Sequence, residues 1–302
     1  MAIDVDVLRL LRAISEEGSI SAAARRLGVS QPAASQQLRR AERSIGTALV
    51  ERAGRTSRPT EPGRVLARHA VGVDNLLAAA EQEVLAVAGL AAGTVRLVAF
   101  PSASARLVPR ALAVLRRAHP DLAVTLAEVE PPASVDLLRS GRADVVVSFE
   151  HVAPSHPPAA DVDGLLVLPL AQDEVRVAVP ERSPWAGRTS VSMRDLHGQE
   201  WIAGCPRCRS HLVDLAAEAG FVPRIRYETD DYLAVVGLVA EGLGVALLPS
   251  LAEVTGAGTG VLTVPLRPVA RRHVVALTTP DLARVPSVAA LLEVLRVTAA
   301  AA

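Results

Sequence analysis

Apolar residues at helical spacing predict a first helix close to the start of the chain. They recur every three positions from 5 to 14, at Val5, Leu8, Leu11 and Ile14. Gly18 follows and can end this helix, because glycine adopts the left-handed conformation common just after a helix. We expect Ser21 to cap a second helix over 22–27 that stops at Gly28, and Ser30 to cap a third. Because the second and third helices are separated by so few residues, the chain must turn sharply between them.

The third helix is predicted to have one apolar and one polar face. Its apolar stripe comprises Ala34, Leu38, Ala41 and Ile45. Off the stripe lie Gln31, Pro32, Gln36, Arg39, Arg40 and Arg43. Glutamine can pair with adenine edges and arginine with guanine or phosphate, so this helix has the chemistry of a helix in a DNA major groove. An ordinary helical hairpin with solvated arginines is the competing interpretation at this point.

Two further patterns extend the N-terminal region. The segment 49–63 contains Arg52, Arg55 and Arg58 among turn-forming residues, which indicates a basic wing. From Pro62 to about Ala88 the pattern is helical again. Its apolar positions are Leu66, His69 or Ala70, Val73, Leu76 or Leu77, Ala80, Val84 and Val87. Such a seam is typical of a helix that packs against a partner helix, although it could also pack on its own domain.

After Gly93 the pattern changes to short β-rich runs that alternate with helices. The runs TVRLVAF, LAVTLAEVE and ADVVVSF predict a first α/β lobe, and EVRVAVP, WIAG, RIRYET and GVALLP predict a second. RHVVALTT and a helix from about Pro286 are expected to return to the first lobe. The chain would then cross twice between the lobes, and the two crossings would form a hinge.

Ligands in open α/β sheets bind beyond the carboxyl ends of strands, so the residues at those ends are candidate ligand-binding residues. These residues are Ser102, Ala103, Ser104, Ser148, Glu150, Cys205, Arg207, Thr229 and Asp230. Each of them has a plainer interpretation as a turn former or a helix-capping residue. Their mixed chemistry suits small polar or anionic metabolites in general and selects no single one.

Composition and charge narrow the class of protein. The 302 residues are 50% apolar and carry no net charge, which fits a folded soluble protein. The charge is unevenly distributed, because residues 1–65 hold 11 Arg against 7 acidic residues and therefore carry +4, which leaves −4 for the remainder. A basic leader followed by an apolar stretch is absent from the sequence, as is a long uncharged apolar run. We therefore expect a cytoplasmic location and no membrane partner.

The segment CPRCRSH, residues 205–211, combines a C-x-x-C motif with a nearby histidine. A zinc site would need a fourth ligand, for which His197 is the nearest candidate, and structural zinc normally uses paired motifs. A thiol-redox switch through Cys205 and Cys208 is a second interpretation, because a helix N-terminus and flanking arginines lower a thiol pKa. We favour a third interpretation, in which both cysteines simply pack in or beside the ligand-binding site. No metal or cofactor is predicted.

The N-terminal sequence GSISAAARRLGVSQPAASQQLRRAERSIGTALVER, followed by RPTEPG, resembles the DNA-binding domain of LysR-type transcriptional regulators. EGLGVALLP resembles a helix-to-strand segment of the effector domain of this family. The chain departs from the family pattern at Ala41, Val50 and Pro59, positions that affect packing more than DNA reading. The resemblance implies DNA contacts at Ser21, Ser30, Gln31, Pro32, Ala33, Ser35, Gln36, Arg39, Arg52 and Arg55. Among these, Gln31, Pro32, Ala33 and Gln36 would approach base edges, and Ser35, Arg39, Arg52 and Arg55 would hold phosphates.

The resemblance also implies a domain plan and a mechanism. Residues 1–61 would form a winged helix-turn-helix, 62–90 a linker helix for dimerisation, and 91–302 a periplasmic-binding-protein-like effector domain. Its first lobe would span about 91–164 and 268–302, and its second about 165–267. A homodimer or homotetramer would bind promoter DNA and could contact RNA polymerase there. A small-molecule effector bound between the lobes would shift the hinge.

An enzyme is the rival class of function. The sequence contains no Gly-x-Ser-x-Gly elbow and no His-Glu-x-x-His, and a chain without lysine cannot contain the phosphate-binding Gly-x-x-x-x-Gly-Lys. A transport-type solute-binding protein would share the two-lobed fold but needs export. We therefore predict a regulator and not an enzyme.

Overall fold

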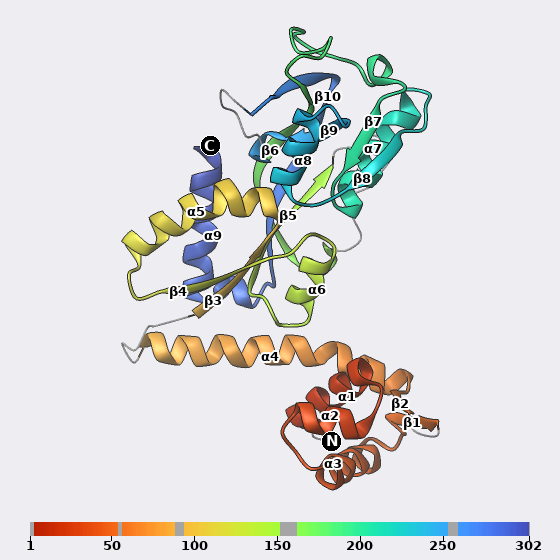
Figure 1. Cartoon of the computed structure of the whole chain (residues 1–302). Helices are drawn as coiled ribbons and strands as arrows, with labels where there is room; N and C mark the ends of the chain where they lie inside the picture. The colour runs from red at the N-terminus through yellow and green to blue at the C-terminus, as the bar shows by residue number, and fades with distance from the viewer. Residues whose placement is uncertain (1–2, 54–55, 88–93, 152–161, 253–258, 302) are drawn as a thin grey trace. The chain divides into compact units, whose positions relative to one another are not determined.

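The computed structural model describes residues 3–53, 56–87, 94–151, 162–252 and 259–301. It divides into two compact units, residues 1–84 and 85–302, which are described separately below. Figure 1 labels the elements of both units. Within the described residues, no helix is long and apolar enough to cross a membrane.

The first unit is a helical domain with a two-stranded wing. Its elements are α1 (Val5–Glu17), α2 (Ile20–Arg26), α3 (Gln31–Ile45), β1 (Val50–Ala53), β2 (Thr56–Pro59) and α4 (Glu61–Val87), whose last residues belong to the second unit. The predicted ends of the first and third helices are confirmed, because Gly18 ends α1 at φ 71° and the Ser30 side chain caps α3. The predicted cap of the second helix is wrong. Ser19 accepts a hydrogen bond from the backbone N–H of Ala22, which starts the helix two residues earlier and leaves Ser21 exposed in its first turn.

The core of this unit forms where the apolar stripes of the three helices meet. Leu11, Ile14 and Leu38 are fully or almost fully buried in it, and Ala41 and Ile45 pack against it, as the stripe on α3 predicts. The wing is fastened to this core by Glu42, whose Oε1 accepts hydrogen bonds from the backbone N–H groups of Leu49 and Val50 at 2.9 and 3.3 Å. The orientation of α3 is thus fixed by packing on one side and by the wing on the other.

The second unit is an α/β domain built on one eight-stranded sheet. The strand order is β4-β3-β5-β10-β6-β9-β7-β8. The strands are β3 (Thr94–Ala99), β4 (Ala123–Glu128), β5 (Val145–His151), β6 (Leu166–Pro180), β7 (Glu200–Ala203), β8 (Arg224–Glu228), β9 (Val245–Pro249) and β10 (Val261–Thr278). The α-helices are α5 (Pro101–Ala118), α6 (Ala133–Arg139), α7 (Pro206–Glu218), α8 (Tyr232–Ala240) and α9 (Pro286–Ala300). Short 3-10 turns lie at Met193–Leu196, Ser250–Ala252 and Leu282–Arg284.

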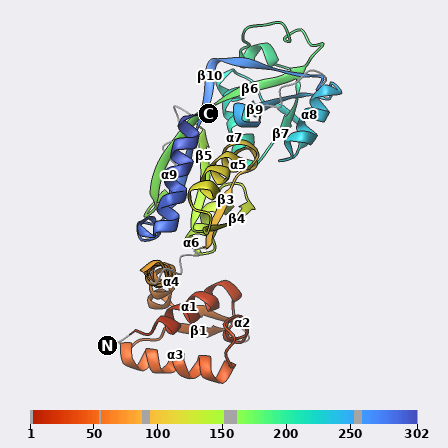
Figure 2. The same ribbon diagram turned by 90° about the vertical axis from the view of Figure 1, so that its left-hand side faces the viewer.

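Two long antiparallel strands join the two lobes of this sheet. The first half of β6 and the second half of β10 pair with each other beside β5, whereas their other halves pair beside β9. Figures 1 and 2 show both strands running through the whole domain. The predicted crossings between the lobes are therefore made by two continuous strands, both longer than the runs recognised in the sequence.

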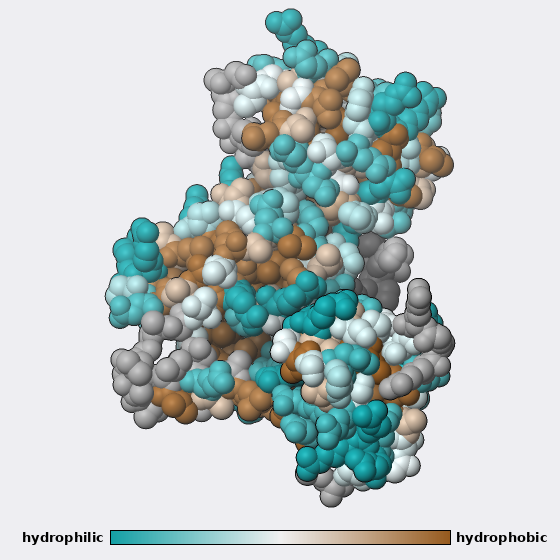
Figure 3. All heavy atoms as spheres, turned by 60° about the horizontal axis from the view of Figure 1, so that its bottom comes forward, coloured by the Kyte–Doolittle hydropathy of each residue, from teal (hydrophilic) through white to brown (hydrophobic). Residues whose placement is uncertain are grey.

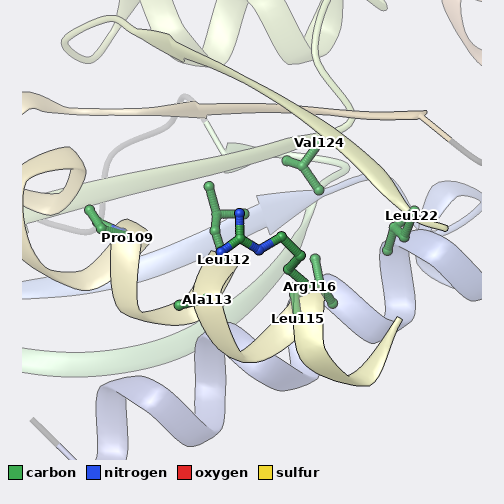
Figure 4. A pocket seen from close by; sticks show the side chains of 7 residues that line it. All are labelled: Pro109, Leu112, Ala113, Leu115, Arg116, Leu122 and Val124. Atoms are coloured by element: carbon green, nitrogen blue, oxygen red, sulfur yellow. The ribbon is translucent and has the colours of Figure 1, made fainter. Parts of the chain in front are cut away.

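One described pocket in this unit lies away from the predicted effector residues. It has a volume of about 350 Å³ and is formed between the second half of α5 and β4. Its lining is Pro109, Leu112, Ala113, Leu115, Arg116, Leu122 and Val124, with the Arg116 side chain reaching toward Leu112 (Figure 4). Figure 3 shows apolar side chains gathered in patches on the surface of the second unit.

Candidate functional site

The first candidate site is the exposed face of α3 in the N-terminal unit. Packing buries Ala34 and Leu38, so the helical repeat turns the opposite positions outward. Gln31, Pro32, Ala33, Gln36, Arg39, Arg40 and Arg43 are all exposed. Gln36 and Ala33 border a hollow of about 610 Å³ next to the start of α1. This face offers amide and guanidinium donors without a neighbouring element of the same unit covering them.

Four of the predicted DNA contacts need separate comment. Ser35 lies on α3 but is buried, and its Oγ lies below the surface without a hydrogen-bond partner, so this structure does not present it to a phosphate. Arg52 lies in β1, within the wing, and nothing is described of its side chain. Arg55 lies outside the described residues. Ser30 is exposed, and its side chain accepts a hydrogen bond from the backbone N–H of Ala33 at 3.3 Å.

The second candidate site lies where β6 and β10 pass between the lobes. Arg272 and Asp173 are opposite each other in the strand register and form a buried ion pair, with Arg272 Nε donating to Asp173 Oδ2 at 2.8 Å. Arg272 Nη2 donates to Ser102 Oγ at 2.7 Å. Asp173 Oδ1 accepts from Ser250 Oγ at 2.6 Å and from the backbone N–H of Leu251 at 3.1 Å. The two opposite charges are thus paired within the buried network, as burial requires.

Aromatic rings enclose the Arg272 guanidinium and continue across the lobes. Its central carbon lies 4.8 Å from the ring centre of Phe100 and 4.5 Å from that of Phe149. Phe149 meets the ring of His151 edge-on, and His151 is stacked on His211 of α7 with ring centres 4.0 Å apart. The chain has only three phenylalanines, and two of them are used here. These ring contacts therefore join the N-cap of α5 and strand β5 in one lobe to α7 in the other.

Burial keeps these histidines uncharged near neutral pH. It lowers the pKa of His151 to about 2, with the neighbouring His211, Arg272 and Arg207 adding to the effect. It also lowers the pKa of His211 to about 4, against the opposing influence of Asp214. Both ring nitrogens of His151 and the Nε2 of His211 lack a hydrogen-bond partner. A group of three or more residues that could hold a metal ion is not found within the described part of the chain.

A second set of polar groups faces the same junction from the ends of β4, β7 and β8. Glu130 contacts Cys205, and burial raises the pKa of Glu130 to about 8, with Cys205 and Asp230 contributing. Tyr232 is in hydrogen-bonding contact with Ser102, and burial raises the pKa of Tyr232 as well. Glu130 Oε2 and Ser104 Oγ are buried without a hydrogen-bond partner. The junction thus offers uncharged acid, hydroxyl and thiol groups suited to a small polar molecule.

The predicted effector residues fall into four groups in the structure, the fourth of which is Ser148 and Glu150 within β5. Ser102 and Cys205 lie in this junction, and Arg207 reaches it by donating from Nη1 to the carbonyl oxygen of Phe149 at 2.7 Å. Ser104 lies in the first turn of α5, and its Oγ is buried without a hydrogen-bond partner. Ala103 is buried in the first turn of α5. Thr229 and Asp230 precede α8, which Asp231 caps in their place.

The expected position of Glu150, just beyond the strand, is wrong, whereas Ser148 lies inside the strand as expected. Both lie inside β5 and pair with β10, at Val275 and His273, because the long antiparallel partner extends β5 as far as His151. Ser148 is buried there, and Glu150 is half-buried. Neither therefore belongs to a loop beyond the strand.

Sequence reasoning missed several residues of this junction, namely Phe100, Glu130, Phe149, His151, Asp173, His211, Tyr232 and Arg272. Glu130 comes just after β4, so the rule that ligands bind beyond strand ends could have found it. The predicted strand LAVTLAEVE included this residue, and Glu130 was therefore not among the residues expected at a strand end. The scarcity of aromatic residues could have drawn attention to Phe100 and Phe149. The Asp173–Arg272 pair depends on the register of two strands far apart in sequence, and no local pattern signals it.

The comparisons with known proteins agree with both halves of the structure. Residues 5–64 match the model described as "Bacterial regulatory helix-turn-helix protein, lysR family", and residues 88–300 match "LysR substrate binding domain". The chain is 29% identical over 309 residues to a probable HTH-type transcriptional regulator LrrA of Synechococcus elongatus, covering 98% of this chain and 97% of that protein. It is 35% identical over 244 residues to the small neutral protease regulatory protein of Streptomyces coelicolor, covering 79% and 75%.

Solved structures share the fold at low sequence identity. A full-length OxyR variant from Pseudomonas aeruginosa is 22% identical with a TM-score of 0.67, covering 98% of this chain and 95% of that one. Full-length CbnR in complex with its target DNA is 23% identical with a TM-score of 0.53, covering 98% and 100%. The family matches span both units and describe regulators, not enzymes. The chain therefore belongs to the LysR family of DNA-binding transcription regulators, with an N-terminal helix-turn-helix domain and a C-terminal effector-binding domain.

Proposed function

We propose that this regulator reads its operator with the exposed face of α3 and holds the DNA backbone with the flanking arginines. Gln31, Pro32, Ala33 and Gln36 approach base edges, while Arg39, Arg52 and Arg55 hold phosphates, with Ser21 and Ser30 close to the backbone. The observation that carries this assignment is the exposure of Gln36 and Arg39 opposite the buried Ala34 and Leu38. The formal net charge of +4 in residues 1–65 supports the assignment, because a positive charge attracts the DNA phosphates.

The proposed operator is an interrupted inverted repeat bound by a homodimer or by a tetramer made of two dimers. The apolar seam of α4 supports self-association, because Leu76 is 52% exposed and Val84 67% exposed in the single chain. A two-fold symmetric protein places two α3 helices on one side of the duplex, so the half-sites should be separated by whole helical turns.

The proposed effector site is the junction between the lobes. The unpartnered buried groups Glu130 Oε2 and His211 Nε2 support this location, because buried polar groups are normally hydrogen-bonded and a ligand can supply the missing partners. A small polar metabolite that binds there would change how the two lobes close about β6 and β10. That change would alter the spacing or the bend imposed on promoter DNA.

Gel-shift titration of the purified chain against its own upstream DNA tests the first proposal. We expect Gln36→Ala to weaken specific binding by about 1–3 kcal/mol and to relax the preference at one base pair. Arg39→Ala should weaken binding to all sequences and reduce the slope of log affinity against log salt by about 0.9. Arg296→Ala, an exposed arginine paired with Glu293 on α9, is the matched control and should bind as the wild type does. Unchanged affinity in both α3 variants would refute the assignment.

A further inference from the structure

The C-x-x-C segment at the start of α7 borders the proposed effector site, and the proposed function gives its two thiols no chemistry of their own. Cys205 follows β7 and caps the helix, with its Sγ accepting a hydrogen bond from the backbone N–H of Cys208 at 3.4 Å. Pro206 occupies the first helical position, where its fixed φ favours the turn. One helical turn thus brings the two sulfurs to 3.0 Å from each other. Both cysteines are free thiols in this structure.

The two thiols differ in exposure and in hydrogen bonding. Cys205 is only 2% exposed, whereas Cys208 is half-buried and can be reached by a small reagent. The Cys205 thiol donates its hydrogen bond to Cys208 Sγ. Together with burial, this bond raises the pKa of Cys205, so Cys205 is the thiol of the pair that stays protonated. The first turn of α7 also favours negative charge through the helix dipole. Cys208 is therefore the thiol that is oxidised first, and Cys205 is the resolving thiol that then attacks it.

We propose that Cys205 and Cys208 form a reversible disulfide within the chain when a small hydroperoxide oxidises Cys208. In the first step the Cys208 thiolate attacks one peroxide oxygen, the O–O bond breaks, and hydroxide leaves, which gives a sulfenic acid on Cys208. In the second step Cys205 Sγ attacks Cys208 Sγ, the S–S bond forms and the S–O bond breaks. The departing oxygen takes up the Cys205 proton and leaves as water. Two thiols are oxidised, and with hydrogen peroxide two waters are produced.

The location of the pair gives the disulfide a consequence for the rest of the domain. Cys205 contacts Glu130 of the other lobe, and Cys208 lies near Tyr232. Oxidation removes the thiol hydrogen of Cys205 and draws its sulfur toward Cys208. The contact between the lobes through Glu130 would then change. This modification is distinct from effector binding and does not depend on the operator assignment.

Thiol chemistry on the full-length chain tests the proposal directly. The reduced protein is treated with hydrogen peroxide, alkylated with N-ethylmaleimide and weighed intact. We expect both thiols to become resistant to alkylation together, with the mass of two hydrogens lost and no oxygen retained on either cysteine, and we expect dithiothreitol to restore both. Oxidation of the methionines adds oxygen and is assigned by peptide mapping. Independent sulfinic acids, a disulfide between two chains, or two thiols that stay reactive would each overturn the proposal.

Two single variants separate the roles of the thiols. Cys205→Ser should stop at the sulfenic acid of Cys208, which dimedone traps as a covalent adduct. In the Cys208→Ser protein, oxidation should consume the Cys205 thiol at least about tenfold more slowly than it consumes either thiol of the wild type. The remaining sulfur is buried and protonated, which makes it a poor nucleophile. Equal rates in the two variants would overturn the assignment of Cys208 as the nucleophile. No DNA is present in these assays, so their outcome is independent of the proposed operator contacts.

Discussion

The buried charge of Arg272 is tolerated because an acidic residue, a hydroxyl group and two aromatic rings around it stabilise a positive charge. Asp173 neutralises it, Ser102 accepts a further hydrogen bond, and two phenylalanine rings cover its faces. Removal of one member of such a pair leaves the other charge buried and unpaired, which costs far more than the pair itself contributes. The same residue ties β10 to the first turn of α5. Its effect should therefore be visible in stability as well as in regulation.

We expect Arg272→Met to lower the free energy of unfolding by about 3–5 kcal/mol, because Asp173 loses its counter-ion in a buried site. Urea unfolding followed by circular dichroism measures the change. Arg296→Met removes an exposed arginine paired with Glu293 and should change stability by no more than about 0.5 kcal/mol. The double variant Arg272→Met with Asp173→Leu should recover a large part of the loss. If the double variant is as unstable as the single one, the unpaired carboxylate is not the cause.

The stacked histidines predict a pH dependence of stability with a definite sign. Their folded-state pKa values, about 2 and about 4, lie below the ordinary value of 6.5, so between these limits the unfolded chain binds more protons than the folded one. The free energy of unfolding therefore has its full value above pH 6.5 and falls as the pH is lowered, by roughly 1.4 kcal/mol per pH unit for each histidine. Glu130 acts in the opposite sense, because its pKa is raised to about 8 and its contribution is lost as the pH rises toward that value.

A variant isolates the histidine contribution from that of Glu130. Relative to the wild type, His211→Phe should gain about 1–3 kcal/mol in free energy of unfolding when the pH is lowered from 7 to 5, since it removes one group that protonates on unfolding. Val213→Ala on the same helix binds no proton, so its difference from the wild type should be the same at both pH values. A pH-independent difference for His211→Phe would show that the pKa of His211 is the same in the folded and the unfolded chain.

At the level of elements, the N-terminal unit was the more predictable from sequence. Three helices, the wing and the linker helix follow from local signals such as the apolar stripe through Leu38 and the glycine at 18. The second unit was predicted as alternating strands and helices, but β6 and β10 are longer than their apolar runs. Polar residues such as Asp173 and Arg272 interrupt the apolar pattern in the middle of these strands, and only their pairing across the sheet keeps the strands continuous. Contacts of this kind are set by tertiary structure and leave no local signature.

The junction between the wing and α4 depends on a glycine. A Cβ added to Gly63 would lie 2.0 Å from the carbonyl oxygen of Leu49, which is backbone and cannot move aside easily. Gly63→Ala should therefore destabilise the N-terminal unit by about 1–3 kcal/mol and weaken DNA binding through the displaced wing. Thermal unfolding and the gel shift measure the two effects. Gly72→Ala in the same helix meets no atom within 4 Å and should leave stability unchanged or raise it by up to about 1 kcal/mol. Similar losses in both variants would mean that glycine flexibility, and not space, matters at position 63.

For the whole molecule, the function requires two DNA-reading heads on one operator, and the seam on α4 is where the proposed dimer would form. Leu76→Glu places a charge in that seam and should weaken self-association by at least about tenfold, equivalent to about 1.4 kcal/mol. Sedimentation velocity at several concentrations measures the effect. Val297→Glu is the matched control, because Val297 on α9 has the same 52% exposure as Leu76 in the single chain.

The DNA readout links self-association to function. A dimer gains affinity from the second half-site without new contacts, because the second head binds at high effective concentration. The Leu76→Glu protein should therefore lose much of its affinity for the full inverted repeat while it keeps the affinity of a single head for one half-site. The Val297→Glu protein should behave as the wild type on both targets. If Leu76→Glu remains dimeric and protects both half-sites, α4 is not the dimerisation helix, and the contact must lie in the effector-binding domain.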